Sequence, residues 1–282
     1  MNLRQNGDIR AFKANWVGRA ETKNNYFSRR KPLTQIQLAF QQHWSFIREV
    51  IGIPKKGKSL EVGCGRGSIS SFFAEAGYRV TLFDLSSEVL ETAKEIYAKN
   101  NHLNRAEFVA GNALKMPFQD NTFDVVISIG LLEHFRSMHQ LLSEQVRVLK
   151  PGGVFIAYVV PKKKSVQTFF QPINNLLKTW LPSEGAGLPK KHTLFRTTYG
   201  SEFYKRHLRK LPVRHIQSCG VYPFPAISPS PRFPFTLLPP AYEKALTEVY
   251  DGLLRERARQ NPHPWACSES WGQTFFLWAK KR

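Results

Sequence analysis

The chain has 282 residues, 42% of them hydrophobic and 22% charged, with a formal net charge of +20 at pH 7. A chain of this length and apolar content can bury a large core, which excludes disorder as its main state. Its three cysteines, Cys64, Cys219 and Cys267, are too few and too far apart for a disulfide scaffold or a structural zinc site. No apolar run reaches the roughly 18 residues of a membrane span. Because the N-terminus also lacks the apolar stretch of about 7 to 15 residues found in signal peptides, we expect a cytoplasmic protein.

The positive charge lies in the two end regions of the chain. Residues 58–160 carry 10 Lys and Arg against 11 Asp and Glu, whereas residues 1–57 have a net charge of +8 and residues 161–282 a net charge of +13. A basic surface of this size favours an anionic partner, either nucleic acid or an anionic membrane surface. We therefore expect three parts: a basic N-terminal arm and cap helix (1–57), a core (58–160) and a basic C-terminal part that covers the substrate (161–282).

Strands and helices alternate through the core. Before it, residues 33–51 repeat apolar side chains at helical spacing and predict an amphipathic helix. Short apolar runs then predict strands at residues 59–62, 80–83, 106–110, 125–129 and 153–159, and helical patterns predict helices at 69–76, 88–100 and 139–149. Strands that alternate with helices form parallel sheets covered on both faces, so we expect an α/β fold.

The regular alternation of predicted strands and helices ends at Pro161. Residues 165–181 place aromatic and aliphatic side chains at helical spacing behind three lysines, which predicts an inserted helical flap. The proline-dense stretch at 222–240 excludes ladder pairing over most of its length and predicts an extended loop. Around this loop the pattern predicts helices at 201–211 and 241–259 and strands at 215–222 and 272–281.

The sharpest motif is a glycine-rich turn after the first strand of the core, LEVGCGRGS at residues 60–68. Gly63, Gly65 and Gly67 let the backbone turn tightly and approach a ligand without a Cβ in the way. A dinucleotide site would have GxGxxG and an acid about 20 residues later, near where Asp84 stands. Here the spacing is GxGxG, and Glu61 precedes the first glycine by two residues. A carboxylate at that place would repel a pyrophosphate, so the turn favours a cationic ligand.

An acid followed by GxGxG resembles the signature of the class I S-adenosylmethionine-dependent methyltransferases. Further blocks resemble the family in the same order: FDLS at 83–86, GNALKMPF at 111–118 with DNTFDVV at 120–126, and LKPGGVF at 149–155. The resemblance implies a Rossmann-like, seven-stranded, mostly parallel sheet with helices on both faces, an N-terminal helical cap and C-terminal insertions. It also implies S-adenosyl-L-methionine as the cofactor.

The resemblance places the cofactor at the carboxyl ends of the strands. Asp84 would accept hydrogen bonds from both ribose hydroxyls. Asn112 stands where the family usually has Asp, so its amide oxygen would contact the amino group of the adenine. The N-terminal arm would close over the cofactor, with Tyr26 and Arg30 facing it. The full set of cofactor-binding residues that the resemblance implies is Glu61, Gly63, Cys64, Gly65, Asp84, Leu85, Asn112, Ala113, Gly130 and Leu131.

His134 is the candidate catalytic residue. It ends the segment SIGLLEH, which follows the fourth strand at the sheet edge where ligands bind, and a histidine titrates near neutral pH. Packing or hydrogen bonding at a helix start is the alternative role. The pair of Glu133 and His134 resembles the LEH of quinone-type O-methyltransferases, some of which use a divalent metal. Ile129 replaces the further carboxylate expected there, so we predict no metal.

The acceptor is expected to be a small, apolar or amphipathic, lipid-like molecule. Enzymes of this fold that methylate base amines typically carry an Asn/Asp-Pro-Pro-aromatic turn after the fourth strand, and SIGLLEH lacks it. The aromatic flap, which includes Phe169, Phe170 and Trp180, suits a lid over an apolar pocket or a helix on an anionic membrane surface. The second option would make the protein peripheral at the membrane. Plain packing on the core is the alternative for the flap.

Two other functions stay open at this point. An RNA methyltransferase would use the basic flanks to bind phosphates. A non-catalytic partner protein would bind the cofactor without turnover. The methylated atom and the oligomeric state do not follow from these residues.

Overall fold

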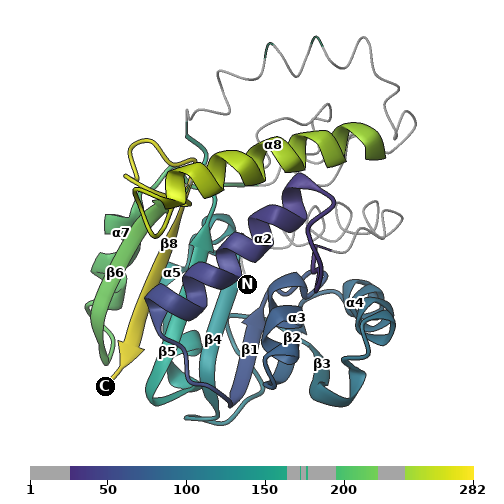
Figure 1. The fold of residues 1–282 in the computed structure, drawn as a ribbon. Helices are drawn as coiled ribbons and strands as arrows, with labels where there is room; N and C mark the ends of the chain where they lie inside the picture. The colour runs from purple at the N-terminus through teal and green to yellow at the C-terminus, as the bar shows by residue number, and fades with distance from the viewer. Residues whose placement is uncertain (1–25, 164–171, 173–175, 177–194, 222–238) are drawn as a thin grey trace.

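The computed structural model describes residues 26–163, 172, 176, 195–221 and 239–282 (Figure 1). In these ranges the chain builds one eight-stranded sheet with the strand order β3-β2-β1-β4-β5-β8-β6-β7. The expected flap at 165–181 and the proline-rich loop at 222–240 lie almost entirely outside the described residues. None of the helices in the described ranges has the length and apolar character needed to cross a membrane.

Five strands are parallel and match the predicted apolar runs: β1 (Lys58–Val62), β2 (Arg79–Asp84), β3 (Ala106–Ala110), β4 (Phe123–Ile129) and β5 (Leu149–Val159). β8 (Thr274–Lys281) runs antiparallel between β5 and β6 (Val213–Val221). The prediction of a mostly parallel sheet is confirmed, but the prediction of seven strands is wrong. The additional strand, β7 (Ala266–Cys267), pairs with the end of β6 and has only two residues, too few for a periodic pattern.

Helices cover both faces of the sheet, as predicted. On the first face lie α2 (Gln35–Phe46) with a π-helical turn (Ile47–Ile51), α3 (Ser68–Glu75) and α4 (Ser87–Lys99), and on the second lie α5 (Met138–Arg147) and α7 (Ser201–Leu208). α8 (Pro240–Ala258) packs beside α2 (Figure 1). Both faces of the central strands are therefore buried, which explains why these strands are apolar at successive positions.

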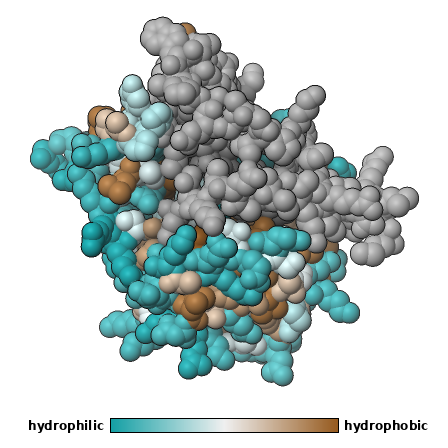
Figure 2. Space-filling view, turned by 90° about the vertical axis from the view of Figure 1, so that its right-hand side faces the viewer, coloured by the Kyte–Doolittle hydropathy of each residue, from teal (hydrophilic) through white to brown (hydrophobic). Residues whose placement is uncertain are grey.

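The sheet ends at β3, on the side of the molecule that carries α4. Seen from that side, the described surface is mostly hydrophilic, with a hydrophobic patch in its lower part (Figure 2). Phe108 and Val109 of β3 are only partly buried, as expected for a strand with a neighbour on one side alone. The buried core lies instead between the central strands and the helices on the two faces.

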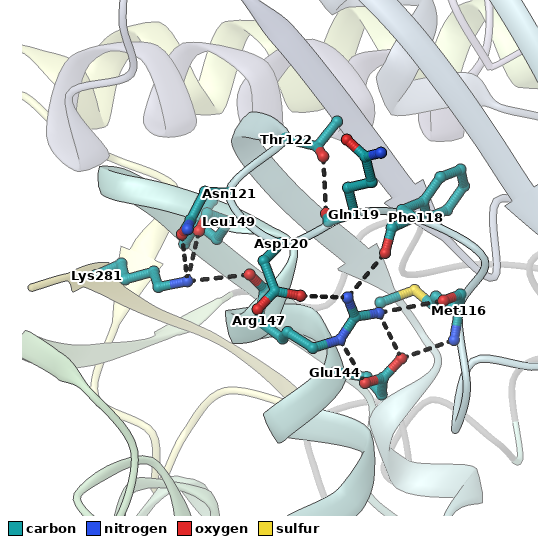
Figure 3. A network of polar contacts seen from close by, with 10 residues as sticks. All are labelled: Met116, Phe118, Gln119, Asp120, Asn121, Thr122, Glu144, Arg147, Leu149 and Lys281. Carbon is teal, nitrogen blue, oxygen red and sulfur yellow. Dashed lines mark hydrogen bonds and ion pairs between the residues drawn. The ribbon is translucent and has the colours of Figure 1, made fainter.

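An arginine network fixes the edge of the sheet at which β4 and β5 begin (Figure 3). Arg147, at the end of α5, donates to the carboxylates of Glu144 and Asp120, at 2.7 Å each, and to two backbone carbonyls of the loop that leads into β4. The side-chain hydrogen bonds between Arg147 and Glu144 raise the pKa of Arg147 and lower the pKa of Glu144. Lys281 of β8 donates to the carbonyl of Leu149 at 2.7 Å. The loop between β3 and β4 is thereby tied to α5, and β8 is tied to the start of β5.

A buried carboxylate joins the N-terminal cap helix to the C-terminal part of the chain. Glu243 of α8 is 3% exposed and accepts from the backbone N–H of Gln35 at 3.0 Å and from its side-chain amide at 3.2 Å. Gln35 is the first residue of α2, where backbone N–H groups have no partner within the helix and the helix dipole favours negative charge. The start of α2 thus depends on α8, although 208 positions separate the two residues.

We expect Glu243→Ala to lower the free energy of unfolding by about 1–3 kcal/mol, because it leaves buried N–H groups of Gln35 without their acceptor. Urea denaturation measures this loss. Glu248→Ala is the matched control on the same helix: its partner Lys31 lies 3.5 Å away and both side chains are about half exposed. The control should cost less than about 1 kcal/mol. Equal losses in the two variants would contradict the capping role of Glu243.

Candidate active site

The glycine-rich turn connects β1 to α3 through three residues with positive φ. Gly63, Gly65 and Gly67 have φ of 68°, 52° and 65°, in the left-handed region that glycine adopts without strain. A Cβ on Gly63 would lie 2.7 Å from Cδ1 of Leu131, and a Cβ on Gly67 would lie 2.2 Å from Cδ2 of Leu82. Conformation and space together therefore exclude a side chain at Gly63 and at Gly67.

Asp84 ends β2 and closes the turn from the neighbouring strand. It is 3% exposed, and its Oδ2 accepts from the N–H of Gly65 at 3.0 Å. Burial raises the pKa of Asp84, and the hydrogen bonds from backbone N–H groups oppose this rise. The carbonyl of Phe83, one residue earlier, accepts from the N–H groups of Gly63 and Cys64 at 2.8 and 3.1 Å. Four of the predicted cofactor-binding residues thus form one hydrogen-bonded unit.

Glu61 lies beneath the turn and faces the first helix of the core. It is 2% exposed, and its Oε2 accepts from the backbone N–H of Ser70, in the first turn of α3, at 3.2 Å. Burial raises the pKa of Glu61 to about 8, and the hydrogen bonds from Ser70 oppose this rise. The side chain stabilises the start of α3, while a contact between Glu61 and a ligand stays a prediction.

The loop after β4 reaches the glycine turn. Leu131 is 6% exposed and its side chain packs on Gly63. The neighbouring Gly130, with φ of 66°, donates its N–H to the carbonyl of Tyr158 near the end of β5, at 2.8 Å. The structure therefore brings both predicted residues of this loop beside the turn.

The other predicted cofactor-binding residues follow β2 and β3. Leu85 directly follows Asp84 and is partly exposed, as is Ala113. Asn112 is exposed, and its Oδ1 accepts from the N–H of Leu114 at 2.9 Å, which closes a tight turn after β3. All three lie where the chain leaves the carboxyl ends of the strands, and their contact with a ligand stays a prediction.

The N-terminal segment approaches the glycine turn through Tyr26. Nη1 of Arg66 lies 3.5 Å from the hydroxyl of Tyr26, and the guanidinium carbon lies 5.6 Å from the centre of its ring. Both residues are buried, and burial lowers the pKa of Arg66. Arg30, expected at the same place, is exposed. Sequence analysis missed Arg66 because it occupies the variable position between two glycines of the motif.

His134 ends a 3-10 turn (Leu132–His134) that follows β4. Its Nδ1 lies 2.7 Å from the carbonyl oxygen of Phe195, and since a carbonyl only accepts, Nδ1 carries the hydrogen. Nε2 lies 3.9 Å from Oε1 of Glu133. The bond to Phe195 is the structural role that the sequence left open, and it also fixes the orientation that a base would need. A catalytic role for His134 stays a prediction.

Glu133 is a candidate that sequence analysis did not select. It is 2% exposed, and its Oε2 has no hydrogen-bond partner in the described structure. Burial raises the pKa of Glu133 to about 7, while the charge of Arg196 acts in the opposite direction. A carboxyl group with this pKa can accept or release a proton near neutral pH, which is what a general acid or base must do.

Aromatic rings surround the end of β5, next to this carboxyl group. The ring of His43, from α2, lies 4.5 Å from the ring of Tyr158 and 4.9 Å from that of Trp265, measured between centroids. Burial lowers the pKa of His43 to about 3, so its ring is neutral. Burial also raises the pKa of Tyr158, and the charge of Glu133 adds to this effect. The aromatic cluster of His43, Tyr158 and Trp265 gives this corner of the sheet apolar surroundings.

The site suits an organic ligand. The residues that the structure describes include no group of three His, Cys, Asp or Glu side chains that could hold a metal ion. At the ends of β1 and β2, a glycine-rich turn lies against the buried carboxylate of Asp84, an arrangement that accepts hydroxyl groups and lets a ligand approach the backbone. A parallel sheet of this order with these two features is the arrangement of the class I methyltransferases.

Comparison with known sequences points to a methyltransferase domain in the same part of the chain. Residues 60–157 match the family model of a methyltransferase domain. The chain is similar to the sterol 4-C-methyltransferase strm-1 of Caenorhabditis elegans, with 30% identity over 151 residues that cover 52% of this chain and 43% of that protein. It is also similar to the ubiquinone/menaquinone biosynthesis C-methyltransferase UbiE of Brucella abortus, with 37% identity over 101 residues, 35% of this chain and 38% of that protein. The chain thus spans less than half the length of these relatives.

Solved structures share the fold. Geranyl diphosphate C-methyltransferase from Streptomyces coelicolor A3(2) has a TM-score of 0.53 at 16% identity, over 88% of this chain and 81% of that chain. The [4+2]-cyclase SpnF has a TM-score of 0.52 at 19% identity, over 91% of this chain and 86% of that chain. At these identities the likeness concerns the fold alone, and the second protein is named for a reaction other than methyl transfer. The reaction and the acceptor have to be argued from the site.

We expect Gly63→Ala to weaken the binding of S-adenosylhomocysteine, the demethylated cofactor, by about tenfold or more, because the added methyl group would collide with Leu131 and displace the turn. Gly52→Ala is the matched control, since Gly52 has φ of 69° but nothing within 4 Å of the added Cβ. The control should cost about 1–2 kcal/mol of stability and leave the affinity unchanged. Calorimetric titration measures the affinity, and undiminished binding by Gly63→Ala would remove the turn from the site.

The buried Glu133 makes stability depend on pH. Its pKa of about 7 in the folded chain exceeds the ordinary value of 4.5, so between these values the folded protein holds a proton that the unfolded chain has lost. The contribution of Glu133 to stability is therefore greatest below pH 4.5 and falls as the pH rises towards 7. Between pH 4.5 and pH 8, the free energy of unfolding of Glu133→Gln should fall less than that of the parent protein, by up to about 3 kcal/mol. Urea unfolding at several pH values tests it, and identical pH profiles would contradict the buried, protonated state.

Proposed function

We propose that this chain is a methyltransferase that transfers a methyl group from S-adenosyl-L-methionine to a small, apolar or amphipathic acceptor. The observation that carries the proposal is the hydrogen bond from Gly65 N–H to Asp84 at the carboxyl ends of β1 and β2, within a domain of the methyltransferase class. This unit combines an acceptor for hydroxyl groups with a backbone that a ligand can approach closely.

The residues present fit the cofactor. When bound, S-adenosyl-L-methionine supplies a methyl group on a positively charged sulfur. Asp84 would accept from ribose hydroxyls, and its buried carboxylate favours a cationic ligand over an anionic one. The remaining residues proposed to hold it are Gly63, Cys64, Gly65, Leu85, Asn112, Ala113, Gly130 and Leu131.

The acceptor is proposed to bind at the carboxyl ends of β4 and β5. Two observations support an apolar, lipid-like molecule there. The aromatic cluster of His43, Tyr158 and Trp265 packs against this end of the sheet, and the relatives are named as sterol and quinone C-methyltransferases. We propose an acceptor of this lipid-like kind, methylated on carbon, oxygen or nitrogen.

The chain's own residues would position the acceptor and move a proton. Methyl transfer from an activated donor depends mainly on alignment, which a rigid site supplies. Glu133, buried and with a pKa of about 7, is the proposed proton acceptor wherever the methylated group must lose a proton. His134, which Phe195 orients through Nδ1, is the second candidate for this role.

The rest of the chain is proposed to enclose the two ligands. Residues 1–57 would close over the cofactor, which the contact between Tyr26 and Arg66 supports. Residues 161–282 would cover the acceptor, in the cytoplasm or at an anionic membrane surface. An RNA acceptor and a non-catalytic role are not favoured, since sterol and quinone enzymes are among the relatives.

The test is the transfer of label from methyl-labelled S-adenosyl-L-methionine into a cell extract that is then separated into organic, aqueous, RNA and protein fractions. We expect the label in the organic phase. Asp84→Asn should reduce the transfer and weaken cofactor binding by more than about tenfold, because it replaces a charged hydrogen-bond acceptor with a neutral one. Asp120→Asn is the matched control, since it alters an exposed carboxylate at the opposite edge of the sheet (Figure 3), and should leave both properties unchanged.

The other possible outcomes would each contradict a different part of the proposal. Label in RNA would overturn the apolar acceptor and assign the basic flanks to phosphate binding. Cofactor binding without label in any fraction would support the non-catalytic alternative. Equal cofactor affinities of Asp84→Asn and Asp120→Asn would exclude Asp84 from the site.

A further inference from the structure

A short strap at residues 195–197 crosses the carboxyl ends of β4 and β5. The N–H of Thr197 donates to the carbonyl of Glu133, after β4, and the carbonyl of Thr197 accepts from the N–H of Lys162, after β5, both at 2.8 Å. The strap therefore lies directly above the proposed acceptor site. It joins the two loops that carry the proton-exchanging carboxyl group and the first of the C-terminal lysines.

Three cationic residues belong to the strap or contact it. Arg196 lies within it and donates from Nε to the carbonyl of Val160 at 3.1 Å. The guanidinium carbon of Arg136 lies 4.4 Å from the centre of the Phe195 ring. Lys162, bonded to the strap through its backbone, is exposed, as is Arg136. The acceptor end of the sheet thus presents positive charge from three segments of the chain.

None of these three cations has an ion-pair partner in the part of the chain that the structure describes, although the charge of Arg196 acts on Glu133. Within the ranges that the structure describes, no carboxylate lies at ion-pair distance from Arg136, Lys162 or Arg196. Several other cations in the same ranges do form ion pairs: Arg29 with Glu75 at 2.8 Å, Lys94 with Glu91 at 2.6 Å and Arg209 with Glu202 at 2.5 Å. Charge that the fold itself does not neutralise, next to a ligand site, attracts an anionic group of the ligand.

We propose that the strap is an anion subsite and that the acceptor carries a phosphate group, bound by Arg136, Lys162 and Arg196. The inference rests on the proposed function and names the acceptor class as an amphipath with a phosphate head and an apolar body. The apolar body would lie towards the aromatic cluster of His43, Tyr158 and Trp265. The phosphate could belong to a single soluble amphipath or to a membrane lipid, and the binding chemistry is the same.

A phosphate fits this cluster better than a carboxylate does. A phosphate monoester carries about −1.5 to −2 charges near neutral pH, which matches several cations, and guanidinium groups bind it through two parallel hydrogen bonds. Arg196 is the cation that acts on Glu133, so the phosphate would lie on the outer side of the strap, towards the exposed Arg136 and Lys162. This placement keeps the anion away from the Glu133 carboxyl group.

The test compares decyl phosphate with decanol, which has the same alkyl chain and no charge, on the full chain saturated with S-adenosylhomocysteine. We expect decyl phosphate to bind about tenfold more tightly or better, with an affinity that falls as salt is added. The double variant Arg136→Gln, Lys162→Gln should lose this preference. Arg206→Gln with Lys210→Gln is the matched control, since it removes the same charge from exposed positions on α7 and just beyond it and should keep the preference.

Vesicles distinguish the two sources of phosphate. If the double variant loses the preference for decyl phosphate but binds vesicles of phosphatidic acid, relative to phosphatidylcholine, as the parent does, the subsite serves a single amphipath. If it loses both the preference and the binding to these vesicles, the subsite serves a lipid headgroup, and either result supports the phosphate site. Equal binding of decyl phosphate and decanol, or equal losses in the two double variants, would overturn it.

A separate titration with S-adenosylhomocysteine keeps this inference apart from the proposed function. Cofactor binding without any preference for decyl phosphate would overturn the anion subsite alone. A preference for decyl phosphate in a chain that does not bind the cofactor would overturn the proposed function instead.

Discussion

The register between β1 and β2 is the constraint on which the site depends. Val62 pairs with Phe83, so β1 ends where β2 offers the carbonyl of Phe83 and the carboxylate of Asp84. The N–H groups of the turn are thereby bonded to the neighbouring strand within a few residues. Because side chains alternate along a strand, a shift of one residue would turn Asp84 to the other face of the sheet. The buried apolar side chains of both strands prevent that shift, so the packing of the core also aligns the site.

The same constraint links the glycine turn to the proposed acceptor site. Leu131 can pack on Gly63 only because the glycine has no side chain, since a Cβ would lie 2.7 Å from Leu131. Two residues further on, Glu133 is bonded through its backbone to Thr197 of the strap. The loop after β4 therefore contacts the glycine turn at one end and the strap at residues 195–197 at the other. A ligand that displaced the turn would act on the acceptor end through these few residues.

The local patterns in the sequence predicted what local chemistry determines. Buried parallel strands are apolar on both faces, so β1 to β5 could be located from short apolar runs. The left-handed turn requires glycine, and Asp84 had the right spacing after it. Glu133 could not be selected in this way, because the residues that act on it are distant in the chain: Thr197 donates to its backbone carbonyl, and the charge of Arg196 acts on its carboxyl group. The raised pKa of Glu133 is therefore a property of tertiary structure, and no sequence pattern around residue 133 predicts it.

Other misses have the same origin. β7 has two residues and exists because it pairs with the end of β6. From its position near the start of α8, Glu243 would be expected to stabilise its own helix. In the structure its carboxylate instead caps the start of α2. Arg66 occupies a variable motif position, and its place beside Tyr26 depends on where the N-terminal segment packs. In each case a partner distant in the chain decides the role, and periodicity carries no information about such partners.

Charge is distributed differently at the two edges of the sheet. Where β4 and β5 begin, Arg147, Lys150 and Lys281 are bonded to carboxylates or carbonyls of the fold, and their charge is used in holding the structure together. Where the same strands end, Arg136 and Lys162 lack acidic partners within the described ranges, and Glu133 is buried at a cost to stability. A fold selected for stability alone would bring such charges together or replace the carboxyl group with an apolar one. Their separation therefore favours a functional role for this edge, in which a ligand supplies the missing partner.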